Sequence, residues 1–132
     1  MKKLILAVLA VLVLGSVCFA EYTGLIIDAQ GLGVRPGMSP KIIDDNGNVV
    51  YGVVYADSET IATKGIIKYA DNLEEAKDDG TVGSNPLIIK ARTRGANPLK
   101  TDVIVSLRNA QQIVRANAES DFLADFRVII VL

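Results

Sequence analysis

The sequence predicts a small α+β domain: a mainly antiparallel or mixed sheet with one or two short helices packed on it. Short runs rich in Val, Ile and Leu recur along the chain between Gly, Pro, Asn and Asp residues, which is typical of strands joined by turns. The expected strands outnumber the expected helices, and the helices do not alternate regularly with strands as they do in a doubly wound α/β domain. These two observations define the class.

Residues 1–20 are typical of a secretory signal peptide. A lysine pair precedes an apolar run over residues 4–15, and small residues end the segment at Ala20. The alternatives are a membrane anchor, and a lipoprotein signal in which Cys18 carries the lipid that anchors the protein in the outer membrane. The residue before that cysteine is a bulky valine, which disfavours lipidation. We therefore expect cleavage after Ala20 and no membrane span in the mature protein.

Cleavage would leave residues 21–132 as a single periplasmic or secreted domain. Two of the 14 basic side chains lie in the signal, so 12 would remain against 15 acidic ones, a net charge of −3. This balance disfavours a nucleic-acid partner and charge-driven binding to an anionic membrane. The chain has no His, and its one cysteine leaves with the signal. We therefore expect no disulfide, no metal site, no cofactor and no histidine-activated nucleophile.

A buried strand and a hairpin are expected in the first half of the domain. The strand covers residues 22–29 and should be buried on both faces near residues 25–27. The hairpin covers residues 41–55, because Asn46 and Gly47 suit the central positions of a type I′ turn, where both residues need positive φ. The cross-strand pairs that this turn predicts are Asp45 with Asn48 and Ile43 with Val50.

Two helices and four more strands are expected in the second half. One helix covers residues 71–79 and is capped by Asp71 or Asn72; the other covers residues 106–118 and is capped by Ser106. The apolar face of the second helix should contain Leu107, Ala110, Ile113 and Val114. The strands cover residues 64–70, 86–94, 101–106 and 127–132, the last of them inside the sheet.

The stretch over residues 24–40, GLIIDAQGLGVRPGMSP, is interpreted as a structural corner. A phosphate-binding loop needs a helix after its glycines, and the prolines here prevent one. A zinc amidase motif needs histidine ligands, which the chain lacks. We expect the glycines to adopt angles that other residues resist, the prolines to stiffen the exit, and Asp28 to accept backbone N–H groups and to pair with Arg35. The corner comprises Asp28, Gly31, Gly33, Arg35, Pro36, Gly37 and Pro40.

Residues 44–48, DDNGN, share oxygen-bearing side chains with a calcium-binding loop. Val49 and Tyr55 stand where such a loop needs a glycine and a glutamate, so we interpret the stretch as the hairpin turn around Asn46 and Gly47. No residue is expected to be catalytic, to hold a cofactor or to bind a metal. The sequence therefore predicts a protein that is not an enzyme.

With those residues in view, the chain resembles a known kind of protein. Residues 22–52 and the later runs NPLIIKA, TDVIVS and FRVIIVL are similar to a module of bacterial envelope proteins related to the FlgP-like flagellar outer-membrane lipoproteins. The resemblance covers most of residues 22–132. It implies a non-enzymatic structural or assembly protein of the cell envelope, in some cases associated with the flagellar apparatus.

The expected partners are other copies of the chain or other envelope proteins. Open strand edges and a near-balanced charge favour self-association, with candidate contacts at the hairpin and at the turn over residues 92–100. The alternative function is a periplasmic accessory domain that binds a small ligand or a cell-wall fragment.

Overall fold

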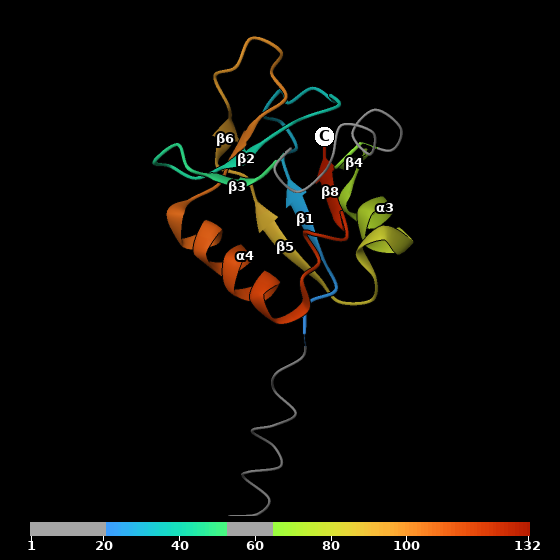
Figure 1. Ribbon diagram of the computed structural model, residues 1–132. Helices are drawn as coiled ribbons and strands as arrows, with labels where there is room; N and C mark the ends of the chain where they lie inside the picture. Colours follow the sequence, from blue (N-terminus) through green and yellow to red (C-terminus); the bar gives the residue numbers. More distant parts are fainter. Residues whose placement is uncertain (1–20, 53–64) are drawn as a thin grey trace, which may run out of the picture.

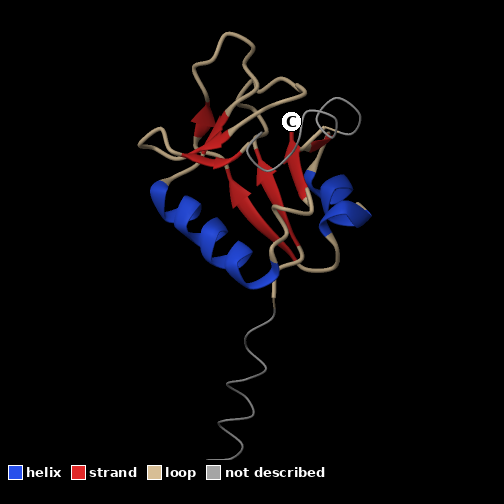
Figure 2. Cartoon of the chain, in the orientation of Figure 1, coloured by secondary structure: helices blue, strands red, loops and turns tan. Residues whose placement is uncertain are grey.

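The computed structural model describes residues 21–52 and 65–132, which form two four-stranded sheets with helices packed on them (Figures 1 and 2). The parallel sheet has the spatial order β4 (Lys68–Ala70), β8 (Val128–Val131), β1 (Gly24–Asp28) and β5 (Pro86–Lys90). The mixed sheet has the order β3 (Val49–Tyr51), β2 (Ile42–Ile43), β7 (Val103–Ile104) and β6 (Thr93–Arg94). The helices are α3 (Leu73–Asp78), the 3-10 helix η2 (Gly80–Val82) and α4 (Leu107–Ser120).

The predicted α+β class is confirmed. The expected signal peptide lies outside the described residues, as do the end of the segment expected to form the hairpin and the first residue of the strand expected over residues 64–70. None of the helices in the described part of the chain is long and apolar enough to cross a membrane.

The centre of the molecule is the pair formed by β1 and β8. Leu25, Ile26 and Ile27 of β1 are fully buried, and so are all four residues of β8. Every pairing in this sheet is parallel, and Leu25 is aligned with both Leu87 and Val128. Strands buried on both faces have continuous apolar sequences, because neither face contacts water. The predicted burial of β1 and the predicted place of the terminal strand inside the sheet are confirmed.

Different elements cover the two faces of the parallel sheet. On one face, Ala76 of α3 and Val82 of η2 pack with Ile26 and Ile129. On the other face, α4 and the mixed sheet complete the larger core cluster around Leu25. Figure 1 shows α3 and α4 on opposite sides of this sheet. The mixed sheet lies beyond the carboxyl ends of β1 and β5, so it extends the core and does not form a separate domain.

The strand expected over residues 86–94 is divided between the two sheets. The backbone N–H of Ala91 donates to Asp28 O of β1, whereas that of Arg92 donates to Ile104 O of β7, both at 2.8 Å. Consecutive donors therefore point to different sheets, and the chain passes from β5 to β6 at this step. A continuous strand was the wrong expectation, because an apolar run does not show where its hydrogen-bond partner changes.

The hairpin is present, but its turn differs from the predicted one. The backbone N–H of Gly47 donates to Asp44 O at 3.1 Å, so Asp45 and Asn46 occupy the central positions. Among the described residues of this turn, only Gly47 has positive φ, at 83°. This arrangement is typical of a type I turn followed by a left-handed glycine, which adds a bulge. The pairs Asp45–Asn48 and Ile43–Val50 are wrong: Asp44 bonds Asn48, and Ile43 is aligned with Val49.

Both helices begin as predicted, but the buried face of α4 is different. Asn72 Oδ1 accepts from Glu75 N at 2.8 Å, and Ser106 Oγ accepts from Asn109 N at 3.1 Å. These side chains satisfy N–H groups that have no partner within the helix. The buried residues of α4 are Ala110, Ile113 and Ala116, whereas Leu107 and Val114 are exposed. The prediction for these last two residues is wrong, and their exposure is important for the surface described below.

Candidate functional site

The predicted corner begins where β1 ends. Asp28 Oδ1 accepts the backbone N–H of Gln30 at 3.1 Å, which holds the first turn of the corner. Gly31 and Gly33 have φ of 79° and 73°, in the left-handed region that favours glycine. No ion pair of the described residues joins Asp28 to Arg35. The predicted pairing is therefore wrong, because the corner carries Arg35 toward another loop.

That other loop is the turn over residues 95–101. Arg35 N donates to Lys100 O at 2.8 Å, and a Cβ atom on Gly37 would lie 2.6 Å from Thr101 Cγ2. Gly37 is therefore required for close packing and not for a positive φ. Residues 29–41 and 95–101 together form one unit, which we call the paired loops.

A tyrosine and an aspartate hold the paired loops on the rest of the domain. The Tyr69 hydroxyl accepts the N–H of Gly37 at 3.1 Å. Burial raises the pKa of the Tyr69 hydroxyl, so Tyr69 stays neutral. At the exit of the corner, beside the buried Pro40, Asp102 Oδ1 accepts the N–H of Lys41 at 3.0 Å. Pro36, in the same loop, is exposed.

The hairpin turn is organised around the Asp44 carboxylate. Asp44 Oδ1 accepts the backbone N–H groups of Asn46 and Asn48, each at 2.9 Å. The hydrogen bond from Asn48 holds the pKa of Asp44 below its usual range. Asp45 forms an ion pair with Arg92 of the neighbouring loop. The carboxylate of Asp44 therefore stabilises the turn. Among the described residues, no group of three acidic, His or Cys side chains could hold a metal ion.

A groove runs between this hairpin and α4, and we call it the α4 groove. It has a volume of about 440 Å³. Three of its apolar side chains are unusually exposed: Val49 at 49 %, Leu107 at 42 % and Val114 at 57 %. The residues that line it are Asp44, Asn48, Val49, Val50, Leu107, Ala110, Gln111, Val114 and Arg115. Sequence reasoning missed this surface, although Leu107 and Val114 are seven residues apart and so lie on one side of the helix.

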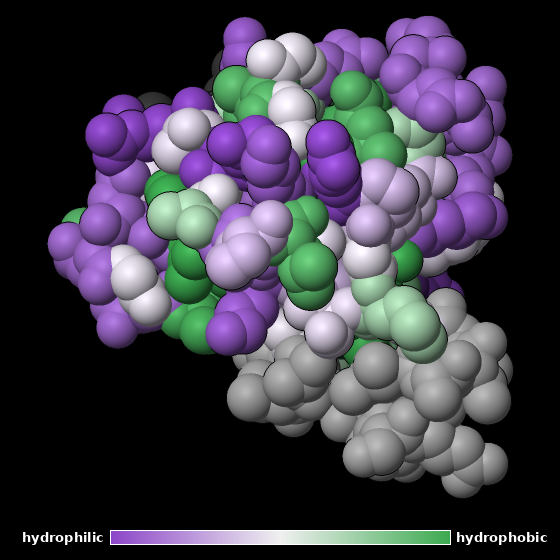
Figure 3. Space-filling view, turned by 90° about the horizontal axis from the view of Figure 1, so that it is seen from above, coloured by the Kyte–Doolittle hydropathy of each residue, from purple (hydrophilic) through white to green (hydrophobic). Residues whose placement is uncertain are grey.

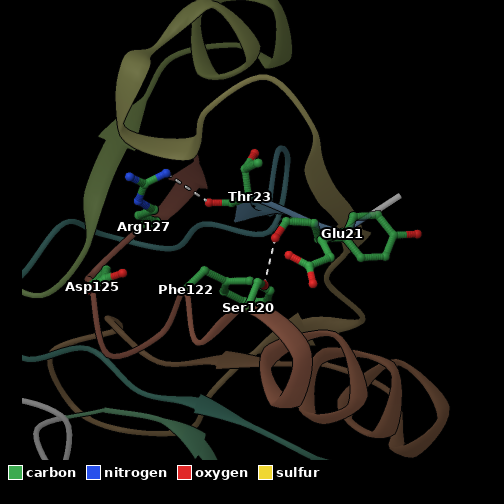
Figure 4. Close-up of a pocket in the computed structure, with 7 residues that line it drawn as sticks. Glu21, Thr23, Ser120, Phe122, Asp125 and Arg127 are labelled. Carbon is green, nitrogen blue, oxygen red and sulfur yellow. Dashed lines mark hydrogen bonds between the residues drawn. The ribbon is translucent and has the colours of Figure 1, made fainter. Parts of the chain in front are cut away.

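A second hollow lies at the amino ends of β1 and β8 (Figure 4). Its volume is about 240 Å³. Arg127 Nη1 donates to Thr23 O at 3.5 Å, and Ser120 Oγ donates to Tyr22 O at 2.7 Å. Figure 4 shows Arg127 and Asp125 at one end, with Glu21 toward the other. The lining therefore combines one cation, two carboxylates and two aromatic side chains; the lining residues are Glu21, Tyr22, Thr23, Ser120, Phe122, Asp125 and Arg127.

A protein-family model matches most of the chain. The model of a family described as the second domain of Treponema pallidum Tp0624 matches residues 24–132. The matched segment starts at the first residue of β1 and includes both sheets, so it corresponds to the whole described fold. The match is to this family and not to the FlgP-like proteins that the strand pattern resembles. A search of curated proteins finds no match.

Proposed function

Because the chain belongs to this family, whose model spans the whole described fold, we propose that it is an exported, non-enzymatic structural protein of the bacterial cell envelope. In this proposal the protein acts by assembling with other copies of itself. The observation that carries the proposal is the distribution of apolar surface. The large apolar side chains that are exposed in the described residues gather mainly on two rigid features, the α4 groove and the paired loops.

Groups of exposed apolar side chains are unfavourable in water, so their presence at one place indicates an interaction site. Single exposed apolar residues are normal on a protein surface, but groups of them at one place mark sites of interaction. The groove presents Val49, Leu107 and Val114 together, and the paired loops present Met38 and Leu99. Figure 3 shows the molecule from the side of the loops, with hydrophobic side chains interspersed among hydrophilic ones. A partner that covers these side chains would remove apolar surface from water, which stabilises association.

The proposal is tested by the mass of the purified protein in solution. Light scattering from micromolar to millimolar concentration should give a mass that rises with concentration. Because apolar contacts are little screened by salt, the rise should persist at high ionic strength. A mass equal to one chain at every concentration and salt would overturn the proposal.

The resemblance to FlgP-like proteins extends the proposal to the flagellar apparatus. The test is the position of a fluorescently labelled chain in its own cells, compared with that of the flagellar bases. Foci that coincide with the bases would support this extension. An even distribution around the envelope would leave a structural role that has no flagellar connection.

The hollow at the amino ends of β1 and β8 favours a second candidate, the binding of a small ligand. A guanidinium beside Phe122 and two carboxylates suits a zwitterion, whose carboxylate would pair with Arg127 and whose ammonium would face Asp125 or Glu21. Titration with free amino acids and short cell-wall peptides, followed by amide NMR shifts, tests it. Shifts confined to residues around Arg127 and abolished in Arg127→Ala would support this candidate, and their absence would remove it.

A further inference from the structure

The tip of the paired loops has the shape and chemistry of a protruding anchor. Leu99 is 74 % exposed and Met38 is 59 % exposed, the highest values among the large apolar side chains of the described residues. Met38 and Leu99 stand on two segments that are joined by the backbone hydrogen bond from Arg35 N to Lys100 O. The same pair of loops therefore presents both side chains to solvent, and we call them together the apolar tip.

The turn that presents Leu99 is held rigidly from within. The N–H of Lys100 donates to Asn97 O at 3.0 Å, which closes the turn. The Asn97 side chain donates to Thr101 Oγ1 at 3.0 Å and accepts the N–H of Asp102 at 3.2 Å. Lys100 has φ of 60°, an uncommon angle for a residue with a side chain. An anchor fixed in this way loses little conformational entropy when it binds.

The α4 groove offers a matching receptor on the same chain. The hairpin wall is held by the hydrogen bonds to Asp44, and the helical wall is capped by Ser106. Five apolar residues of these two walls line the groove, with Asp44 and Arg115 as the charged groups of the lining. The groove therefore combines an apolar lining with no net charge.

Charge decides which surfaces of two copies can meet. Arg35 and Lys100 stand on the paired loops, and Arg94 Nη1 donates to Gly33 O of the same unit at 3.5 Å. The ion pairs of the described residues include none of these three cations. Two tips in contact would bring three cations against three, which is unfavourable. A tip placed in a groove meets no such excess, because the groove lining carries one acidic and one basic side chain, Asp44 and Arg115. The charges therefore favour contact between unlike surfaces.

From this combination, and resting on the proposed assembly function, we infer that copies of the chain associate head to tail. The apolar tip of one copy, Leu99 and Met38, occupies the α4 groove of the next. A contact between unlike surfaces leaves a free tip at one end and a free groove at the other. It therefore produces either a closed ring or an open helical filament.

Two single substitutions on the full chain test the inference. Leu99→Asp removes the tip and leaves the groove; Val114→Asp removes the groove and leaves the tip. Each should weaken self-association by roughly 10- to 100-fold, as expected for the loss of one buried aliphatic anchor. Gln112→Asp places the same charge on an exposed position of α4 outside the groove and should associate like the wild type.

The decisive measurement mixes the two defective variants. Head-to-tail contact predicts that the mixture forms a one-to-one heterodimer, because one variant supplies an intact groove and the other an intact tip. Met38→Asp and Leu107→Asp provide a second pair if a member of the first pair does not give a cooperative melt. A mixture that stays monomeric would overturn the inference. So would a Leu99→Asp variant that assembles normally while Val114→Asp does not, which would indicate groove-to-groove contact.

The outcomes separate this inference from the proposed function. Wild-type protein that assembles while both variants assemble equally well would overturn the head-to-tail contact and leave the structural role intact. Wild-type protein that stays monomeric would overturn both.

Discussion

The parallel sheet and the rim formed by the paired loops, the hairpin and α4 use apolar residues in opposite ways. In β1 and β8, the apolar residues from Leu25 to Ile27 and from Val128 to Val131 are fully buried. On the rim, Val49, Leu107, Val114 and Leu99 are between 42 % and 74 % exposed. The same residue types therefore hold the fold in one region and are left uncovered in the other.

This difference separates stability from recognition. Removing a side chain from the sheet should lower the free energy of unfolding, because the burial of each of these side chains stabilises the folded state. Removing one from the rim should leave that free energy nearly unchanged and weaken association instead.

Deletion of residues 128–132 should abolish the folded state. The deletion removes β8, which lies between β1 and β4, and with it four buried side chains worth roughly 1.5–3 kcal/mol each. Their sum, roughly 6–12 kcal/mol, is comparable to a typical total stability of about 5–15 kcal/mol. Circular dichroism should show no cooperative melt. A deletion variant that melts cooperatively would contradict the central role of β8.

The substitution Ile129→Ala should cost about 2–5 kcal/mol of unfolding free energy, because it leaves a cavity between the sheet and α3. The matched rim substitution Leu107→Ala should cost about 0.5 kcal/mol or less, because Leu107 is already in contact with water. Urea denaturation of both variants measures the difference. Equal losses of stability in the two variants would show that Leu107 contributes as much to the core as Ile129 does.

The substitution Gly24→Ala should cost roughly 1–3 kcal/mol through overpacking. Its Cβ atom would lie 2.6 Å from Val82 Cα, a backbone atom that cannot rotate away. In addition, Thr23 Oγ1 donates to Val82 O at 2.6 Å and holds η2 against the start of β1. Gly80→Ala is the control, since the Cβ atom that this substitution adds would have no such neighbour within 4 Å. Thermal melts of the two variants should differ clearly, and similar melting temperatures would argue against this close packing.

Much of the sheet could be predicted from the sequence, because burial on both faces produces a local signal. The runs around Ile26 and Ile129 are continuous in apolar residues and are fully buried in the structure. The same continuity is also typical of parallel pairing. The caps Asn72 and Ser106 were predictable too, because a cap acts on a backbone N–H only three residues away.

The rim could not be predicted, because it depends on which elements meet. Val114 has the same spacing along α4 as a core residue, but in the structure it lines the groove beside the hairpin and is exposed. The turn around Gly47 was misassigned because the side chain of Asp44 bonds two backbone N–H groups and so favours a type I turn. Arg35 was paired with the wrong loop, since its true neighbour, Lys100, is far away in the sequence.

The smallest expected effect is that of an ion pair on the α3 side of the parallel sheet. Lys68 Nζ lies 2.6 Å from Asp79 Oδ2. The hydrogen bonds that Lys68 and Thr81 donate to the Asp79 carboxylate lower the pKa of Asp79 to about 2 from an ordinary value of 3.8. A carboxyl whose pKa is depressed by folding stabilises the folded state above its unfolded pKa and loses that contribution as the pH falls toward the folded value. The contribution should therefore be complete above about pH 4 and disappear toward pH 2. Because the Lys68 side chain is 57 % exposed, solvent screening should limit it to about 1 kcal/mol or less. Urea denaturation of the wild type and of Lys68→Met, at pH 6 and at pH 2, measures this contribution. Lys77→Met is the control, because Lys77 belongs to a more exposed pair in which its Nζ is 3.9 Å from Glu74 Oε1. The difference in unfolding free energy between the wild type and Lys68→Met should be smaller at pH 2 than at pH 6. An equal difference at both pH values would show that packing of the lysine stem, and not its charge, stabilises this side of the sheet.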